Sequence, residues 1–483
     1  ALSQGLLKKF RSQVVTCLWG RRAKFRCKEI VFSLLCHGHA LDPIWAVSHN
    51  AFLVFKRLLD SRSDFLPLYE HVWHLRHNKR SPVTGPVGNL LNAAKFLGFK
   101  WRDPYRLQAN VWDQRVLELQ TLDLPELAHE LRNYARYKFM SQAGDRRNDM
   151  QGLQFGVDSL ASTRLLRSTG KDQVHKGILR SILAGAINYG HRLFRAGIWD
   201  SDVCPFCGCC EPETLEHMFW RCPAWREERF KHSLATSAWR QDWPACFSCC
   251  GILSDGVIID ADSVDWVGPS VPVVPPVVVA TGTGTTHGSF EGGAVVIYTD
   301  GACIYNQIPS LRRAGVGVWW GDGHADNYSA PLPGQVQTNQ RAELAAVIYA
   351  LENELRPSHI KSDSAYVVNG CSKHRHAWAA LNWHRIMHAD LWKKLHILIE
   401  SRPRGSVTIS KVKGHASHRD VKRGKVKMQD KVGNDGADAL ATTGAAAHAL
   451  PPHVVRRAML QFAVAEDVQR LMVDIVTARS SHA

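Results

Sequence analysis

The sequence predicts three successive parts: a mainly helical N-terminal region, a small cysteine-rich module and a C-terminal α/β domain. Three observations support this prediction. Leucines and aromatic residues recur every three or four positions from Leu124 to Met140, eight of the 13 cysteines fall between Cys204 and Cys250, and short strand-like runs alternate with helical patterns from Ala294 onward. A chain of 483 residues is too long for one ordinary core, so two or three domains are expected.

The charge balance favours a polyanionic partner. The chain has 60 Lys and Arg against 44 Asp and Glu, a net charge of +16. A basic membrane-surface protein is the competing idea, but there is no run of 18 apolar residues and no secretory apolar segment at the start. The Arg-rich opening could pass for a transit peptide. Because the chain starts at Ala1 without Met, we interpret it as an internal start and expect a fragment or a processed product.

Changes in composition set the expected boundaries. Prolines mixed with valines, then Gly and Thr, run from Val271 to Gly293 and predict an extended linker, because proline removes donors that a central strand needs. We expect a helical region at 1–170, a helix pair and cysteine module at 171–260, the linker at 261–293, the α/β domain at 294–448 and a C-terminal helix at 449–483.

The cysteine module has the spacing of a structural zinc site. It contains Cys204-x2-Cys207 followed by His217-x4-Cys222, and four nitrogen and sulfur ligands close a tetrahedral zinc site with no open position. Cys209 and Cys210 could replace a ligand, and the alternative is a cluster of reduced, buried cysteines. Clustered cysteines of this kind favour a reducing compartment over a disulfide framework. We expect an intracellular protein, with the nucleus favoured over the cytoplasm.

The pattern "CPFCG…ETLEHMFWRCPAW" resembles the zinc-binding module that follows the reverse transcriptase domain in non-LTR retrotransposon proteins. The likeness covers roughly residues 173 to 230 and implies that residues 1–170 follow a polymerase region. The aspartate motif of that polymerase is not found upstream, which fits a fragment that begins after it. The remaining cysteines of the cluster could form a second partial site, but no matching histidine pair is evident, and they stay unassigned: Cys246, Cys249 and Cys250.

Four acidic residues of the α/β domain lie at the ends of predicted strands or on predicted helices. Asp300 and Gly301 follow the strand-like run "AVVIY", although Asp-Gly is also a common turn pair. Glu343 falls in the early turns of a helix that Thr338 can cap. Asp363 lies at a second strand-to-helix junction, and Asp438 lies on a short, alanine-rich helix. The stretch "AGVGVWWGDGHADNYSAPL" predicts two strands joined as a hairpin at residues 321–323.

Carboxylates at such junctions could converge at one end of a sheet. Their charges would repel, and hard divalent cations would relieve the repulsion, since Mg²⁺ and Mn²⁺ prefer oxygen ligands. Two such ions about 3.5–4 Å apart can activate water and stabilise the leaving oxygen in a phosphodiester displacement.

The segments "YTDGAC", "TNQRAEL", "SDSAYVVNG", "VKGHA" and "GNDGADALA", in that order, resemble ribonuclease H of type I over about Val295 to Ala447. The resemblance implies a five-stranded mixed sheet flanked by helices and hydrolysis of the RNA strand of RNA–DNA hybrids with two Mg²⁺ or Mn²⁺ ions. It makes Asp300, Glu343, Asp363 and Asp438 the metal ligands and His415 a mobile general acid/base, although His415 could be a plain loop residue. Asp435 is a rival for Asp438.

The resemblance also implies contacts to the nucleic acid. It places these side chains there: Cys303, Asn339, Gln340, Asn369 and Lys413. Amides suit the ribose 2′-hydroxyl because they offer a donor and an acceptor, but Asn339 and Gln340 could instead cap a helix. The insert after His415 is longer than in bacterial relatives and carries six basic residues, either as a solvated loop or as a phosphate contact.

The segment from Cys371 to Leu395 interleaves bases with tryptophans, and it resembles the basic handle by which some relatives hold the hybrid. Trp392, at helical spacing from Leu395, is the tryptophan that we expect in the core.

The sequence therefore predicts a retroelement-derived protein with a helical N-terminal part, a zinc module, a linker and a ribonuclease H domain, and it leaves open whether a polymerase domain lies upstream of Ala1. The runner-up hypothesis is an inactive relic that binds nucleic acid through its zinc module and basic surfaces. The complete carboxylate set favours the enzyme. A transposase-like nuclease on the same fold is a third idea, which "TNQRAEL" and "VKGHA" disfavour.

Overall fold

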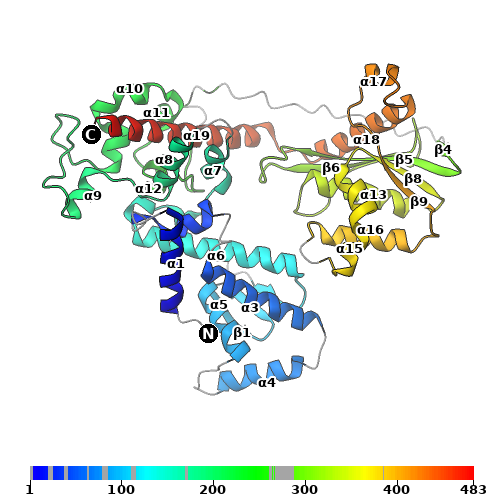
Figure 1. Cartoon of the computed structure of the whole chain (residues 1–483), viewed down its shortest axis with the longest axis horizontal. Helices are drawn as coiled ribbons and strands as arrows, with labels where there is room; N and C mark the ends of the chain where they lie inside the picture. The colour runs from blue at the N-terminus through cyan, green and yellow to red at the C-terminus, as the bar shows by residue number, and fades with distance from the viewer. Residues whose placement is uncertain are drawn as a thin grey trace. The chain divides into compact units, whose positions relative to one another are not determined.

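The structure, a computed structural model, divides into two compact units (Figure 1). The first comprises residues 1–268 and 458–483, and the second comprises residues 269–457. The described residues are 4–19, 25–36, 42–61, 65–78, 85–109, 116–168, 172–259, 264, 266, 288–383 and 386–482. The predicted linker at 261–293 lies mostly outside them. Among the described helices, none is long and apolar enough to cross a membrane.

The N-terminal part of the first unit is mainly helical, as predicted. Its helices are α1 (Gln4–Trp19), α2 (Lys28–Ile30), α3 (Pro43–Asp60), α4 (Phe65–Asn78), α5 (Gly85–Leu97) and α6 (Leu124–Arg146). Helix α6 starts where the leucine periodicity starts, because Asp123 and Glu126 form a reciprocal capping box. The helices pack on a core of buried side chains that includes Phe52, Leu107 and Leu131.

A small antiparallel sheet in this region was missed by the sequence analysis. Its strands are β1 (Phe99–Asp103), β2 (Arg106–Ala109) and β3 (Val116–Glu118), in the order β1–β2–β3. Each strand has five residues or fewer, too short for a clear alternation of apolar and polar positions.

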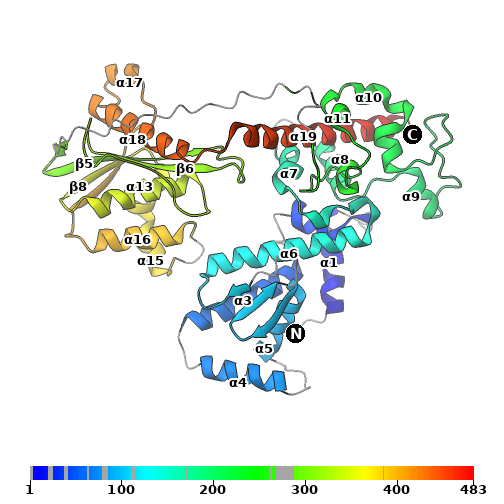
Figure 2. The same cartoon turned by 180° about the vertical axis from the view of Figure 1, so that it is seen from behind.

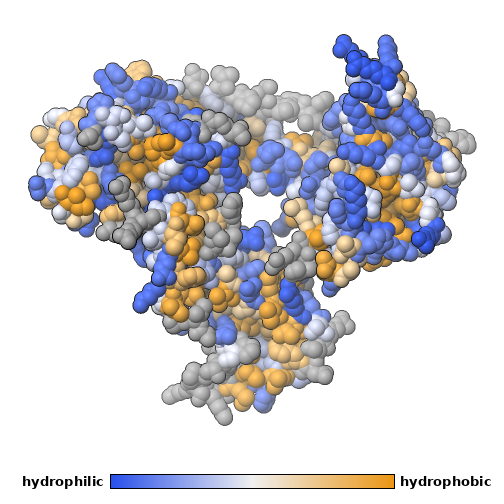
Figure 3. Space-filling model, in the orientation of Figure 1, coloured by the Kyte–Doolittle hydropathy of each residue, from blue (hydrophilic) through white to orange (hydrophobic). Residues whose placement is uncertain are grey.

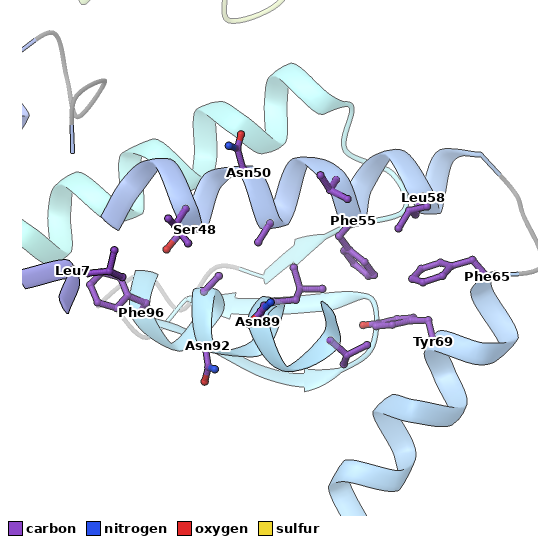
Figure 4. Close-up of a pocket in the computed structure, with 16 residues that line it drawn as sticks. Leu7, Ser48, Asn50, Phe55, Leu58, Phe65, Tyr69, Asn89, Asn92 and Phe96 are labelled. Carbon is purple, nitrogen blue, oxygen red and sulfur yellow. The ribbon is translucent and has the colours of Figure 1, made fainter. Parts of the chain in front are cut away.

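An apolar pocket of about 640 Å³ opens between α3, α4 and α5 (Figure 4). Phe55, Leu58, Phe65 and Tyr69 face one another across it, and Asn89 also borders it. Its described lining holds no carboxylate, histidine, cysteine or basic side chain, and the hydroxyl of Tyr69 donates to the carbonyl oxygen of Pro104 at 2.6 Å.

The rest of the first unit surrounds the C-terminal helix α19 (Pro452–Ser481). Its shorter helices are α7 (Ser159–Arg167), α8 (Gln173–Leu183), α9 (Gly190–Arg195), α10 (Arg226–Phe230), α11 (Ser233–Ala238) and α12 (Ala245–Ser248). The amide of Gln469 on α19 donates to the carbonyl oxygens of Ser162 (3.0 Å) and Gly251 (2.8 Å). Arg479, near the end of α19, forms a two-point ion pair with the buried Glu213.

His232 forms a further link to α19. Its buried imidazole lies 2.8 Å from Asp467 Oδ1 through Nδ1 and 2.9 Å from Asp474 Oδ2 through Nε2. Burial opposes the charged ring, but hydrogen bonds and charge from both carboxylates outweigh it and raise the pKa of His232 to about 9.

We expect the stability of the first unit to fall at alkaline pH. A folded-state pKa above the unfolded value of 6.5 contributes stability that is complete below about pH 6.5 and is lost as pH rises through about 9. Melting temperatures of the full chain between pH 6 and 10 should show this loss, and a His232→Gln variant should show a flatter profile. Parallel profiles for the two proteins would contradict the prediction.

The second unit is a sheet with helices on both faces (Figure 2). Five strands follow the order β7–β6–β5–β8–β9, and the two-residue strand β4 pairs with β5. The strands are β4 (Phe290–Glu291), β5 (Ala294–Ile304), β6 (Arg313–Trp319), β7 (Tyr328–Pro331), β8 (Ser358–Ser362) and β9 (Val407–Lys411). β5 is antiparallel to β6 and parallel to β8, so the sheet is mixed, and the predicted hairpin is the antiparallel pair β6–β7.

Helices of the second unit cover the two faces of the sheet. They are α13 (Asn339–Asn353), α14 (Ala365–Asn369), α15 (Arg375–Ala380), α16 (Ala389–Glu400), α17 (His418–Lys422) and α18 (Met428–Ala446). α13 and α16 lie on one face and α18 on the other (Figure 2). The alternation of β5 explains this arrangement: Val295 and Ile297 join the core beneath α13, whereas Val296 and Tyr298 pack on the α18 side.

Candidate functional site

Asp300 lies within a strand and does not begin a turn. β5 continues past it to Ile304, so the turn alternative for Asp300 and Gly301 is wrong. The absence of a side chain at Gly301 permits a close approach of α13 to β5: a Cβ at this position would lie 2.3 Å from the backbone nitrogen of Glu343. The missing side chain lets α13 press against β5 and brings Glu343 beside Asp300.

Three of the predicted carboxylates form one cluster. Asp300 on β5, Glu343 on α13 and Asp363 after β8 place ligand oxygens within 4.8 Å of one another. Asp438, on α18, lies close enough to Asp300 for its negative charge to raise the pKa of Asp300. That helix has 19 residues, so the expectation of a short helix is wrong. The rival Asp435 is exposed and pairs with Lys431 on the same helix.

Without a cation, burial and mutual repulsion disfavour the charged forms of the carboxylates in this cluster. Asp300 is 7% exposed, and burial together with the negative charges of Asp363 and Asp438 raises its pKa to about 7. Glu343 is 6% exposed, and burial with the charges of Asp300 and Asp363 raises its pKa to about 9. A cation at this place would reverse both effects.

Divalent cations fit these residues. Oε2 of Glu343 is buried and has no hydrogen-bond partner among the described residues, an unusual state for a carboxylate oxygen. Its other oxygen, Oε1, accepts a hydrogen bond of 3.1 Å from the amide of Asn339. The donor set consists of carboxylate oxygens, the type that Mg²⁺ and Mn²⁺ prefer.

Two neighbours of the cluster were missed from the sequence. Ser364 lies beside Glu343 and partly opposes the rise in the pKa of that carboxyl, and the Ser364 hydroxyl also caps α14 by accepting from the backbone NH of Val367. Gly414 packs so closely on Asp363 that a Cβ would lie 2.2 Å from Oδ2. Serine after Asp363 could have been read as a cap, but no sequence signal indicated the contact of Gly414.

The predicted nucleic-acid contacts lie on the elements around the cluster, and their roles stay predictions. Thr338, and not Asn339 or Gln340, caps α13 by accepting from the backbone NH of Arg341. Asn339 is half-buried against Glu343, and Gln340 is exposed. The half-buried Cys303 thiol faces the carbonyl oxygens of Ile304 and Gln337.

The remaining predicted contacts are exposed. Asn369 ends α14, and Lys413 forms an ion pair of 2.8 Å with Asp420. His415 lies in a turn with φ of 46°, next to the Gly414 that packs on Asp363. The structure thus places His415 on the side of the carboxylate cluster. Its side chain has no hydrogen-bond partner among the described residues.

The basic insert after His415 is partly helical. It forms α17 and runs into α18, and its hydrophilic side chains gather over α17 (Figure 3). Lys427 and Lys431 are paired with acidic residues, whereas Arg419, Lys422, Arg423 and Lys425 are exposed.

The tryptophans of the basic segment serve mostly as core. Trp392 is fully buried, as predicted, and its Nε1 donates to the Tyr366 hydroxyl at 2.7 Å. Trp383 is also buried, and only the half-buried Trp378 retains a partly open face.

The cysteine module brings its four predicted ligands together. Ligand atoms of Cys204, Cys207, His217 and Cys222 lie within 4.8 Å of one another. Cys207 Sγ is 3.4 Å from His217 Nε2, and Nδ1 of the same ring is 3.0 Å from Glu211. A carboxylate on the far nitrogen orients a histidine ligand, a contact that the sequence analysis missed. The donor set of three thiols and one imidazole fits zinc.

The other cysteines of the cluster do not join this group. Cys209 and Cys210 are exposed. Cys246 and Cys250 are fully buried, and the Cys250 thiol donates to the carbonyl oxygen of Asp149 at 3.4 Å. Within the described residues, they form no second metal-binding group.

Comparison with known proteins assigns the second unit to a family. Residues 292–446 match the sequence model of RNase H. The chain is 34% identical over 166 residues to ribonuclease H of Aromatoleum aromaticum, which covers 32% of this chain and 95% of that protein. The chain belongs to the ribonuclease H family. The resemblance and the predicted fold are confirmed for this ribonuclease H domain.

Two animal relatives match over a smaller share of their length. Human ribonuclease H1 is 33% identical over 183 residues, which is 37% of this chain and 57% of that protein. Mouse ribonuclease H1 is 31% identical over 163 residues, or 32% and 52% of the two chains. The chain spans about half the length of these two relatives, and the matches cover about a third of the chain itself.

Proposed function

We propose that the ribonuclease H domain hydrolyses the RNA strand of RNA–DNA hybrids internally. The observation that carries this proposal is the convergence of Asp300, Glu343, Asp363 and Asp438 from separate elements, with a buried Glu343 oxygen left without a partner. Members of the family use divalent metals such as Mg²⁺. The same complete set argues against the alternative of an inactive nucleic-acid-binding relic.

The four carboxylates would hold two divalent ions. Bound there, Mg²⁺ or Mn²⁺ supplies Lewis-acid activation of water and charge stabilisation at the leaving oxygen. Asn339 fixes one oxygen of Glu343, and Gly414 seats Asp363. The exposed His415 beside Gly414 is free to accept or deliver a proton at the product side, a general acid/base role.

Recognition of the hybrid would combine ribose contacts near the cluster with phosphate contacts farther out. Cys303, Asn339, Gln340 and Asn369 are the proposed ribose contacts, since a 2′-hydroxyl both donates and accepts a hydrogen bond. Lys413 and the exposed bases of α17 are the proposed phosphate contacts.

We expect Asn339→Ala and Gln340→Ala to weaken hybrid cleavage while metal binding persists. Asn339→Ala removes a donor to Glu343 and a ribose contact, and Gln340→Ala removes an exposed amide. Cleavage kinetics and calorimetric titration with Mn²⁺ measure the two effects separately. Two variants that cut at the wild-type rate would show that these side chains do not read the ribose.

Gly301→Ala should disrupt the site without touching any carboxylate. The new methyl would meet backbone atoms of Ala342 and Glu343, so α13 must shift. Overpacking of this kind costs about 1–3 kcal/mol, and a displacement of about 1 Å at a catalytic group can lower the rate ~10²-fold. Thermal melting and hybrid cleavage measure both effects.

The matched control is Gly177→Ala, a helical glycine with open space around its Cβ position. Alanine there should leave cleavage unchanged and stabilise α8 slightly. Equal behaviour of the two variants would contradict the close-approach argument.

The cysteine module is proposed to hold one structural zinc through Cys204, Cys207, His217 and Cys222. Its likeness to the module of non-LTR retrotransposon proteins supports a retroelement-derived protein. The buried thiols of Cys204 and Cys222, the oriented imidazole and a set of four protein ligands, which is enough to fill a tetrahedral site, suit a structural role over a catalytic one.

A cleavage assay tests the main proposal. Purified full chain is incubated with an end-labelled RNA–DNA hybrid and Mg²⁺, next to single-stranded RNA and double-stranded DNA of the same sequence. Internal cuts confined to the RNA of the hybrid support the proposal. Intact hybrid under both Mg²⁺ and Mn²⁺ would overturn it.

A further inference from the structure

An arginine-rich pocket lies in the first unit, apart from both candidate metal sites. It has a volume of about 510 Å³ and is bordered by η2 (Val31–Leu35), α6, α7 and α8. Four arginines line it: Arg132, Arg136, Arg167 and Arg180. None of the four side chains has a carboxylate or hydrogen-bond partner in the part of the chain that the structure describes.

Helix periodicity directs these groups into the pocket. Arg132 and Arg136 are four residues apart on α6 and therefore share a face. Ser159 and Arg167 lie on α7 at a spacing of eight residues, which is again one face. Two like charges at a four-residue spacing repel, so the pairing is unfavourable for the helix unless an anion lies between or beside them.

Two buried polar atoms in the pocket have no hydrogen-bond partner. They are Nε of Arg136 and the hydroxyl oxygen of Ser159. Burial and the charge of Arg132 lower the pKa of Arg136, which shows that the site disfavours an uncompensated guanidinium group. The carboxylate of Asp158, which precedes Ser159, caps α7 by accepting from the backbone NH groups of Leu160 and Ala161.

A second polar pocket in the same unit has arginines that pair with carboxylates. Its volume is about 860 Å³ and it is also bordered by arginines. There, Arg147 and Arg192 both pair with Asp149, at 2.7 and 3.1 Å. Arg146 pairs with Glu29. Each of these three guanidinium groups has a carboxylate partner, whereas the four of the arginine pocket have none among the described residues.

We propose that the arginine pocket binds phosphate groups of a nucleic-acid strand. Planar guanidinium groups offer paired donors that match phosphate oxygens. The pocket has no aromatic side chain on which a base could stack, so it favours the backbone over a mononucleotide and carries no sequence preference. Arg132 and Arg167 are exposed at the rim, where a long strand can reach them. A net charge of +16 fits the same partner.

The test measures binding of the full chain to a fluorescent RNA–DNA hybrid without added divalent metal, so that no strand is cut. Arg136→Gln with Arg180→Gln should weaken binding ~10-fold and make the slope of log K against log salt shallower by about 1–2. The control, Arg106→Gln with Arg470→Gln, removes the same charge from an exposed and a half-buried arginine that pair with Glu118 and Glu466. Affinity equal to that of the control would overturn the proposal.

A second pair keeps the test decisive if the buried variant does not fold. Arg132→Gln with Arg167→Gln changes only the exposed rim and should weaken binding ~3-fold or more. A third arm separates the source of phosphate by following thermal melting with inorganic phosphate. Phosphate that stabilises the wild type while both arginine pairs keep full nucleic-acid affinity would assign the pocket to a free anion and overturn the nucleic-acid assignment. Because cleavage is not measured, failure here is distinct from failure of the proposed nuclease.

Discussion

Asp300→Asn is expected to reduce cleavage of an RNA–DNA hybrid by at least ~10²-fold. The replacement keeps the shape of the side chain but removes a negative charge from the centre of the carboxylate cluster, where Asp300 contacts the other members from β5. Loss of that charge weakens the proposed hold on divalent ions, which supply the activation of water. The measurement is the initial rate with labelled hybrid at saturating Mg²⁺, with hybrid binding measured in parallel.

Asp435→Asn is the matched control for Asp300→Asn. Asp435 has the same side chain and lies three residues from Asp438, but it is exposed and pairs with Lys431. Its replacement should leave the rate within about twofold, because exposed ion pairs contribute little. If Asp300→Asn cut the hybrid at the wild-type rate, the carboxylate cluster would not be the reaction centre.

The carboxylates could be found from the sequence because each stands in a short local motif. Thr338 marks the start of α13. The apolar run from Val295 to Tyr298, which is buried in the structure, marks the strand before Asp300. The continuation of β5 beyond Gly301 could not be found in the same way. A glycine that permits close approach and a glycine that permits a turn look identical in sequence, and the difference here lies in the position of α13.

Tertiary packing also determined what the sequence analysis missed. α18 runs for 19 residues because small residues let it lie directly on β6: a Cβ at Gly315 or Gly317 would meet backbone atoms of α18. Lys361 is a charged residue inside the sheet, on β8, and it is 5% exposed. It is buried because its ammonium group pairs with Glu291 (2.9 Å) and Asp430 (2.7 Å), both distant in sequence.

The arginine pocket also could not be predicted from the sequence. Arg132, Arg136, Arg167 and Arg180 appear in sequence as the polar faces of separate amphipathic helices. Only the packing of α6, α7 and α8 brings them around one cavity. Solvated charges on one helix are ordinary, whereas the half-buried Arg136 and Arg180 lack a carboxylate partner among the described residues, so their desolvation costs stability unless an anion binds.

Replacement of Cys207 or Cys222 by serine is expected to remove zinc from the chain and to unfold the cysteine module. Serine is a poor zinc ligand, and the free energy of binding a structural zinc, on the order of 10 kcal/mol, is largely folding free energy of its module. Cys222 and His217 are almost fully buried, so their loss cannot be compensated by solvent.

Elemental analysis of the full chain should give about one zinc in the wild type and in the exposed-cysteine control Cys209→Ser, and none in the two variants. Thermal melting should show an early transition in the variants, because the module packs against α19 through the ion pair of Glu213 with Arg479. Stoichiometric zinc in both ligand variants, or its absence from the wild type, would contradict the assignment.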